Sequence, residues 1–365
     1  MADRYWVGTN SDWHTAANWS LTSGGAGGAG VPTSADDVYI DGNGYVLCWA
    51  TTAFECNNFT ILSGSTEMCL FDQGGIIYGD FEMQDGYFGP TGGGGYTVEF
   101  KGNWLNTGGT FAVGTGTGVD PTCEFSGTNK TYALNQVTSA SFQNVLISGT
   151  LTVKGTRLAQ MNISQKLSVT GTLTIDKYDL TTICDIRLDG INAGLDTFTG
   201  TINGTGRVLF EYRDSHTMPT TGTISIRYWR FVMQDSTASL PARTFSNPCE
   251  VEIDYEVDGQ TFTLEAGRHY FDRVTFYCDV SSVSATFDCD TNTAEMWCNS
   301  IFKTDNNAFP SGTFYVKFGD GTHIFRNAVQ FYFSYSSATT HLDVDPGEGT
   351  LILWPKGLAS IILSK

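Results

Sequence analysis

The sequence predicts an all-β protein built as a β-solenoid, a right-handed parallel β-helix whose coils stack on one another. The chain has 365 residues, is rich in Thr and in Gly (42 residues), and is poor in residues that stabilise helices. Short alternating runs separated by Gly, Asn, Asp, Ser and Thr follow one another from about Val46 onward. Aromatic residues make up 13% of the chain, enough buried area to exclude disorder.

A repeat of 22 residues is the most specific of these signals. The run Asn144–Val153 is echoed by Lys166–Ile175, and each contains a strand, a Ser/Thr-Gly-Thr corner and a second strand. One coil of a solenoid needs such a unit, with Gly at the sharp corner and Val, Ile and Leu stacked inside. The alternative is a sandwich or meander with Thr-Gly hairpins, which the scarcity of Asn-Gly and Asp-Gly turns disfavours.

The coils are expected over residues 46–226. We expect strands in this segment and beyond it at residues 59–62, 96–100, 145–147, 151–153, 167–169, 173–175, 208–210, 224–226, 262–264 and 313–316.

Residues 1–45 differ from the rest of the chain in composition and are expected to cap the solenoid. Trp6, Trp13 and Trp19 fall within fourteen residues, and a Gly-rich run follows at 24–30, which we interpret as a flexible or corner segment. A solenoid has an open apolar end that would otherwise pair with another chain, so a Trp-rich lid is physically reasonable there.

Residues 227–365 are expected to continue the β region less regularly. Aromatic residues are dense, as at 228–231 and 331–335, and the apolar runs 351–355 and 361–363 come near the end. We interpret this segment as a surface for assembly with other copies of the chain, with a homotrimer as the expected state.

The charge balance excludes several classes of partner. The chain carries 38 acidic against 20 basic residues, a net charge of -18, with no basic run for a phosphate backbone. No apolar stretch is long enough for a membrane span, and the start lacks the apolar segment of a secretory signal. We therefore expect no nucleic acid and no membrane insertion.

Cysteine and histidine give no metal or catalytic signature. The nine Cys include no Cys-x-x-Cys pair and are expected to be free core thiols: Cys48, Cys56, Cys69, Cys123, Cys184, Cys249, Cys278, Cys289 and Cys298. The five His are scattered: His14, His216, His269, His323 and His341. A Gly-x-Ser-x-Gly elbow and a phosphate loop are both missing. We assign no catalytic, cofactor-binding or metal residue.

Three weaker possibilities stay open beside that assignment. Glycan cleavage would need paired carboxylates, for which the candidates are Asp254, Glu256, Asp258 and Glu265, or Asp343, Asp345 and Glu348. Structural calcium could sit at Asp41–Gly44, Gly319–Gly321 or Asp343–Glu348, although Asp-Gly is also ordinary turn chemistry. Trp229 with Tyr228, Trp297 and Trp354 are candidate sugar-stacking platforms, although aromatic residues more often pack in a core.

The opening of the chain resembles repeat-rich structural proteins of bacteriophage virions. The pattern runs from Tyr5–Gly8 through Asp12-Trp13 and Ala16–Ser20 to Val31–Val38, and continues at Cys56–Ile61 and Phe142–Val153. Bacterial surface proteins with β-helical passengers open similarly, but normally add a signal peptide and a membrane barrel. The resemblance covers about 60 residues closely and implies architecture and setting rather than catalytic residues.

The function expected from the resemblance is structural. It implies a non-enzymatic virion protein, either a tail spike or fibre or a capsid decoration subunit, made in the host cytoplasm and contacting other virion proteins and host surface glycans. The alternatives are a glycan-depolymerising tail spike and a bacterial adhesin or filament subunit.

Overall fold

A computed structural model describes most of the chain. Outside the described residues lie 1, 10, 43–46, 66–67, 72, 91–94, 114–120, 135–138, 156–158, 177–183, 190–193, 213–220, 234–236, 241–249, 256–259, 265–266, 279–284, 289–293, 307–312, 318–321, 326–328, 336–340, 346–349, 354–361 and 364–365. Beyond residue 232 the strands are described mainly by their backbone. The chain divides into two compact units, Met1–Ile186 and Arg187–Lys365.

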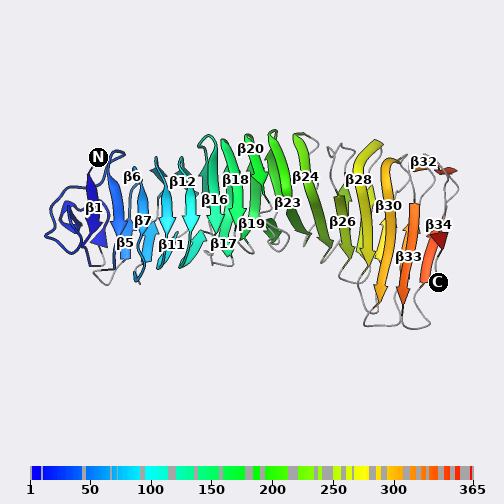
Figure 1. Cartoon of the computed structure of the whole chain (residues 1–365), viewed down its shortest axis with the longest axis horizontal. Coiled ribbons are helices and arrows are strands. Elements are labelled where there is room, and N and C mark those ends of the chain that lie inside the picture. Colours follow the sequence, from blue (N-terminus) through cyan, green and yellow to red (C-terminus); the bar gives the residue numbers. More distant parts are fainter. Residues whose placement is uncertain are drawn as a thin grey trace. The chain divides into compact units, whose positions relative to one another are not determined.

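Unit 1 is a β-solenoid of parallel strands, which confirms the predicted fold class (Figure 1). Each coil contributes strands to three ladders, here called faces 1, 2 and 3. Face 1 contains β4 (Asp37–Ile40), β7 (Phe59–Ile61), β10 (Phe81–Met83), β13 (Trp104–Asn106), β16 (Lys130–Leu134), β18 (Thr150–Gly155) and β20 (Thr172–Ile175).

Faces 2 and 3 follow face 1 within each coil. Face 2 contains β5 (Leu47–Ala50), β8 (Met68–Phe71), β11 (Tyr87–Pro90) and β14 (Thr110–Val113). Face 3 contains β6 (Phe54–Cys56), β9 (Gly75–Ile77), β12 (Thr97–Phe100) and β15 (Thr122–Phe125). In the later coils β17 (Ser139–Ile147) and β19 (Ala159–Val169) each run through both faces, with a register shift between Phe142 and Asn144.

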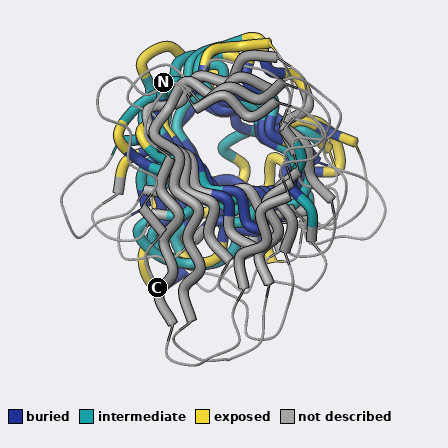
Figure 2. Tube along the Cα trace, turned by 90° about the vertical axis from the view of Figure 1, so that its right-hand side faces the viewer, coloured by how far each residue is buried: buried dark blue, intermediate teal, exposed yellow. Residues whose placement is uncertain are grey.

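The core of unit 1 is made of columns in which each inward residue stacks on its equivalent in the next coil. Buried residues lie on the inner side of the coils (Figure 2). On face 1 the ring centroids of Phe59 and Phe81 are 5.8 Å apart, those of Phe81 and Trp104 5.6 Å, and those of Trp104 and Tyr132 4.4 Å. Strand alternation places these residues inside and their polar neighbours outside.

The 22-residue repeat is confirmed as a register. Val145 pairs with Leu167, and Leu151 pairs with Leu173. At the corner between faces 3 and 1, the N–H of Thr172 donates to the carbonyl of Gly149 at 2.8 Å. A Cβ on Gly171 would collide with that carbonyl oxygen, so this corner requires a residue without a side chain.

The cap contains a short antiparallel pair and one helical turn. β1 (Asp3–Trp6) pairs parallel with β4 and antiparallel with β3 (Trp19–Ser20), while β2 (Ser11–Asp12) pairs with β5. A 3-10 turn spans Ala16–Asn18. The ladders therefore begin at residue 3, inside the segment assigned to the cap, because Trp6, Val38 and Ile40 already alternate inward.

Three fully buried Trp side chains close this end of unit 1. Trp6, Trp13 and Trp19 are each at most 1% exposed, and the indole Nε1 of Trp19 donates to the carbonyl of Trp13 at 2.6 Å. The Gly-rich run packs along β3, where Ala29 N–H donates to the carbonyl of Trp19 at 2.9 Å. A Cβ on Gly27 would collide with the carbonyl of Ala17, whereas a Cβ on Gly28 or Gly30 would meet open space, so the run packs closely at Gly27 and is exposed over much of its length.

Unit 2 continues the all-β pattern with parallel pairing. Its main ladder contains β23 (Thr201–Tyr212), β24 (Thr223–Met233), β26 (Glu250–Tyr255), β28 (Gly267–Cys278), β30 (Ala294–Asn306), β33 (Val329–Tyr335) and β36 (Ile362–Leu363), with β32 (Thr322–Phe325) and β35 (Thr350–Leu353) paired alongside. A second sheet contains β25 (Thr237–Leu240), β27 (Gln260–Leu264), β29 (Ala285–Asp288), β31 (Thr313–Lys317) and β34 (His341–Asp345). The remaining strands are β21 (Cys184–Asp189), at the division of the units, and β22 (Gly194–Phe198).

Each strand expected from the sequence is found, wholly or nearly so, within an observed strand. The two compact units divide between Ile186 and Arg187. The sequence segments, in contrast, divide at residues 226/227, where strand spacing becomes less regular and aromatic residues more frequent.

Candidate functional site

Polar side chains form a ladder along the corner that leads into face 1. Its members are Asp37, Asn58, Asp80, Asn103 and Thr131, hereafter the corner ladder. Asn58 donates its backbone N–H and Nδ2 to Asp37 Oδ1 at 3.2 and 2.9 Å, and Asp80 N–H donates to Asn58 Oδ1 at 2.7 Å. Asn103 donates its N–H and Nδ2 to Asp80 Oδ1 at 2.8 and 3.1 Å. Thr131 closes the series with its N–H and hydroxyl on Asn103 Oδ1, both at 3.1 Å.

The order of residues in the corner ladder has an electrostatic reason. Asp alternates with Asn, so two carboxylates never occupy adjacent rungs, and each Asn both donates to one neighbour and accepts from the next. Asp37 is only 9% exposed and also accepts from Asn57 Nδ2 at 2.8 Å. The ladder therefore satisfies polar groups that range from buried Asp37 to exposed Asp80, and its role is structural.

Within the described part of the chain, a depression of about 440 Å³ on face 3 gathers carboxylates. It is lined by Ala53, Phe54, Glu55, Gly74, Gly75, Ile76, Thr97, Glu99 and Glu124. The ladder registers place Glu55, Ile76, Glu99 and Glu124 in one outward column. We call this feature the acidic depression.

Two of its three carboxylates are engaged by the next coil. Ser126 Oγ donates to Glu99 Oε1 and Ser148 Oγ donates to Glu124 Oε1, each at 2.6 Å. Lys101 Nζ lies 3.6 Å from Glu99 Oε1 and 4.6 Å from the ring centroid of Tyr78. Glu99 and Glu124 thus each bond to a Ser that lies one coil further along, which joins neighbouring coils. The surface of the depression is still acidic and open to solvent.

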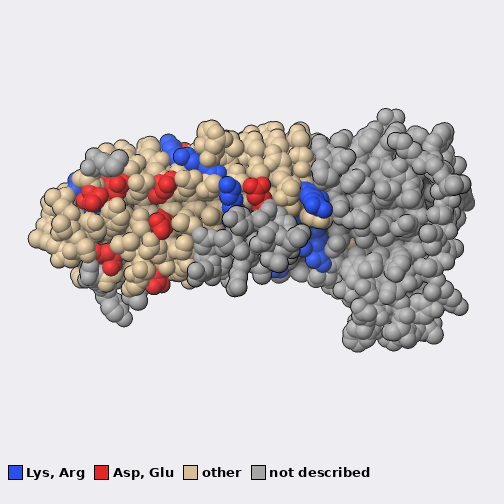
Figure 3. Space-filling model, viewed as in Figure 1, with Lys and Arg blue, Asp and Glu red and all other residues tan. Residues whose placement is uncertain are grey.

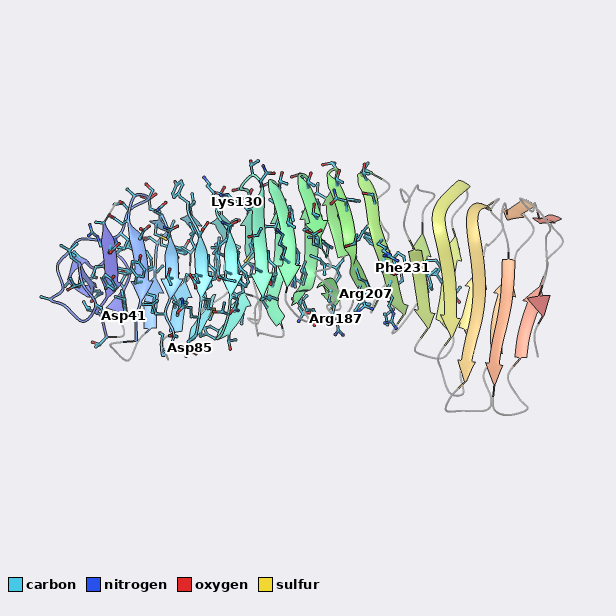
Figure 4. All side chains as sticks on the ribbon, in the orientation of Figure 1. Asp41, Asp85, Lys130, Arg187, Arg207 and Phe231 are labelled. Atoms are coloured by element: carbon cyan, nitrogen blue, oxygen red, sulfur yellow. The ribbon has the colours of Figure 1, made fainter. Side chains whose placement is uncertain are left out.

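Charge is unevenly distributed over unit 1. The described acidic side chains concentrate in the coils up to Glu124, while Lys130, Lys154 and Lys166 belong to the later coils (Figure 3). Asp41 and Asp85 lie along one edge of unit 1 and Lys130 along the opposite edge (Figure 4). The acidic part would repel an anionic polymer and attract a basic partner.

Among the described residues, His14 and its neighbours form a second group that resembles a catalytic arrangement. Its Nδ1 lies 3.4 Å from Asp12 Oδ1, and the Thr52 hydroxyl lies 3.2 Å from Nδ1 and 3.1 Å from Nε2. Nearly equal distances to both nitrogens place the hydroxyl above the ring, away from the in-plane lone pair that a general base uses. The trio therefore lacks the geometry of a nucleophile, base and acid triad.

Comparisons with family models, with curated proteins and with solved structures find no match. No helix in the described part of the chain is long and apolar enough to cross a membrane.

The carboxylates singled out in the sequence are not brought together by any described contact. Asp254 lies on β26, and Asp343 and Asp345 lie on β34, where their ladder partners are Tyr315 and Lys317. Glu256, Asp258, Glu265 and Glu348 lie outside the described residues. The acidic depression was missed because its members are spaced by whole coils and become neighbours only in the stacked fold.

The calcium and aromatic candidates fare differently. Asn43, Gly44 and residues 319–321 lie outside the described part, so calcium at those turns stays a prediction. Where residues are described, no group of three or more His, Cys, Asp and Glu is placed to hold a metal.

Trp229 is 0% exposed, so the hypothesis that its ring forms a platform for sugar stacking is wrong. The ring of Tyr228 has the guanidinium carbon of Arg227 5.1 Å from its centroid. Trp297 lies on β30, and Trp354 lies outside the described residues.

Cysteine behaves as expected where its side chain is described. Cys56, Cys69 and Cys123 are buried free thiols. Burial raises the pKa of Cys56 and of Cys123, which leaves them protonated and inert. Cys48, Cys184, Cys278 and Cys298 lie on strands, and Cys249 and Cys289 lie outside the described residues.

Proposed function

We propose that this chain is a non-enzymatic structural protein of a bacteriophage virion, either a tail spike or fibre or a capsid decoration subunit. The observation that supports a structural, non-enzymatic role is that several described carboxylates accept hydrogen bonds from neighbouring coils. Asp37 and Asp80 serve the corner ladder, and Glu99 and Glu124 accept Ser hydroxyls from the next coil. Acidic side chains committed to holding coils together support a scaffold role.

The virion setting is supported by the resemblance of the opening and by the fold. A capped solenoid of parallel strands suits a rigid projection, because each coil is fixed by its neighbours and the cap covers one apolar end. The same architecture also suits adhesins, so location is the property to test.

The deciding experiment is immunogold labelling of virus particles from the source, with antibody raised against this chain. Label at the tail or its tip supports a spike or fibre, and regular label over the capsid supports decoration. Unlabelled particles together with decorated cells or free filaments would overturn the virion proposal in favour of an adhesin or filament subunit.

Self-association into a trimer, with contact to other virion proteins and host surface glycans, belongs to the same proposal. The aromatic-rich segment 227–365 supports it, since such sequences favour interfaces. Light scattering at micromolar concentration tests the oligomeric state, and a monodisperse monomer would contradict it.

Glycan cleavage is the second candidate, and the acidic depression is the observation that favours it. Glu99 and Glu124 occupy adjacent rungs, about 4.8 Å apart along the ladder. Retaining glycosidases hold their two carboxyl groups roughly 5 Å apart, so a pair of Glu side chains on neighbouring strands is the arrangement to test. Release of reducing ends from host polysaccharide by the wild-type chain, abolished in Glu99→Gln and Glu124→Gln and retained in Glu82→Gln, would establish cleavage. Equal release by all variants would exclude this site.

A further inference from the structure

His14 stands at the junction between the cap and the first coil. Its backbone follows β2 in the cap, and its ring reaches across to the turn before β6. Nε2 lies 3.2 Å from the carbonyl oxygen of Ala53, while Nδ1 lies 3.4 Å from Asp12 Oδ1. One ring therefore contacts both parts of the molecule.

Both of these neighbours are acceptors. A backbone carbonyl and a carboxylate offer no proton, so each contact is a hydrogen bond only if the ring nitrogen donates. Neutral imidazole carries one N–H and satisfies one contact, leaving a lone pair directed at the other oxygen. Imidazolium carries two N–H groups and satisfies both.

Asp12 is held as a stable acceptor in this arrangement. Partial burial raises its pKa, but hydrogen bonds from the His14 N–H, the Thr51 hydroxyl and the His14 ring outweigh that effect and bring the pKa below its ordinary value. The His14 N–H and Thr51 Oγ1 lie 3.0 and 2.9 Å from its oxygens. Asp12 is the charged group in contact with the ring among the described residues, and Thr52 adds a neutral hydroxyl.

The junction controls a large apolar contact. Trp13, next to His14 in the chain, packs against Phe54 of the first coil and Phe59 at the start of the second, with ring centroids 5.2 and 6.0 Å away. It also lies 4.7 Å from Trp19. Loosening of residues 12–14 would therefore weaken the part of the cap's apolar cover that Trp13 provides.

We propose that His14 is a proton-operated latch that holds the cap on the first coil when its ring is protonated and releases it partly when the ring is neutral. Imidazole is the side chain whose charge ordinarily changes between mildly acidic and mildly alkaline conditions, so those are the conditions that the test compares. The device is independent of whether the protein belongs to a virion.

Hydrogen exchange followed by mass spectrometry tests the latch on the full chain at pH 5.5 and 8.0, after correction for intrinsic exchange rates. Peptides covering residues 11–20 and 51–56 should be protected about threefold to tenfold more at pH 5.5. His14→Gln should remove that difference, and the matched control His269→Gln in unit 2 should keep it. The proposal is overturned if His14→Gln keeps the wild-type pH dependence or if protection is greater at pH 8.0.

A second measurement remains informative if His14→Gln folds poorly. In wild-type protein labelled with nitrogen-15 at histidine, both ring N–H groups of His14 should be visible as slowly exchanging protons at pH 5.5. In Asp12→Asn, which keeps the shape and removes the charge, the Nδ1 proton should exchange several times faster. Ring protons of His14 that exchange freely with water at pH 5.5 in the wild type would refute the latch.

Discussion

At the scale of single residues, Tyr132 carries a polar group that its surroundings do not use. The side chain is 0% exposed, its ring stacks on Trp104 at 4.4 Å, and its hydroxyl has no hydrogen-bond partner among the described residues. A buried hydroxyl without a partner costs free energy, while the ring supplies the stacking. Tyr132→Phe should leave the free energy of unfolding at pH 7 unchanged or raise it by up to about 1 kcal/mol. Urea denaturation measures this, and a loss above about 1 kcal/mol would reveal a partner.

Alkaline pH should destabilise the chain through the same residue and the buried thiols. Burial raises the pKa of Tyr132 above 10.0, with a smaller effect from Cys123, and raises that of Cys123 above 9.0. These groups stay protonated in the folded chain at a pH where they ionise in the unfolded chain. The stabilisation that comes from keeping these groups protonated is fully present below about pH 9. As pH rises further, the free energy of unfolding falls by about 1.4 kcal/mol per pH unit for each group.

Denaturation at pH 7.5, 9 and 10.5 measures this slope. Tyr132→Phe and Cys123→Ala should each flatten it above the ordinary pKa of the group removed. Identical slopes in wild type and both variants would show that other groups govern alkaline unfolding.

At the scale of elements, the corner ladder joins successive coils along the corner that leads into face 1. Asp37 begins it and accepts three hydrogen bonds, from Asn57 Nδ2, Asn58 N–H and Asn58 Nδ2. Asp37→Ala leaves the backbone N–H of Asn58 without its acceptor. The variant should lower the free energy of unfolding by about 2 kcal/mol, because a hydrogen bond to a charged group contributes about 1.5–3 kcal/mol. Asp37→Asn keeps an acceptor oxygen and should cost less. Equal losses in the two variants would contradict a hydrogen-bonding role.

The elements differ in how well the sequence predicts them. Coils with Thr-Gly corners were predictable because alternation and a 22-residue offset are local patterns, as the pairing of Leu151 with Leu173 confirms. The corner ladder and the acidic depression were not predicted, since Asp37 and Asn58 meet only after coils of unequal length have stacked. Earlier coils change length at their loops: the inward residues Phe81 and Trp104 are 23 apart, but Trp104 and Tyr132 are 28 apart. A fixed period therefore misses their register.

At the scale of the whole molecule, unit 1 is quasi-one-dimensional, because each coil is stabilised by the coils on either side. Damage to one coil should spread to its neighbours before it affects the rest of the unit. Gly149 tests this behaviour, since a Cβ there would collide with the carbonyl of Gly127 and with the backbone of Ser126. Gly149→Val forces the corner apart and should cost about 2 kcal/mol or more.

Hydrogen exchange should map that cost onto the structure. In Gly149→Val, amides of β15, β16, β18 and β20 should exchange at least tenfold faster, while those of β4 and β7 should keep wild-type rates. Lys154→Ala, which removes an exposed side chain from the same coil, is the matched control and should change neither set. Uniform acceleration across β4 to β20 would mean that unit 1 unfolds as one cooperative block, because the strain at one corner would then be shared by coils that it does not touch.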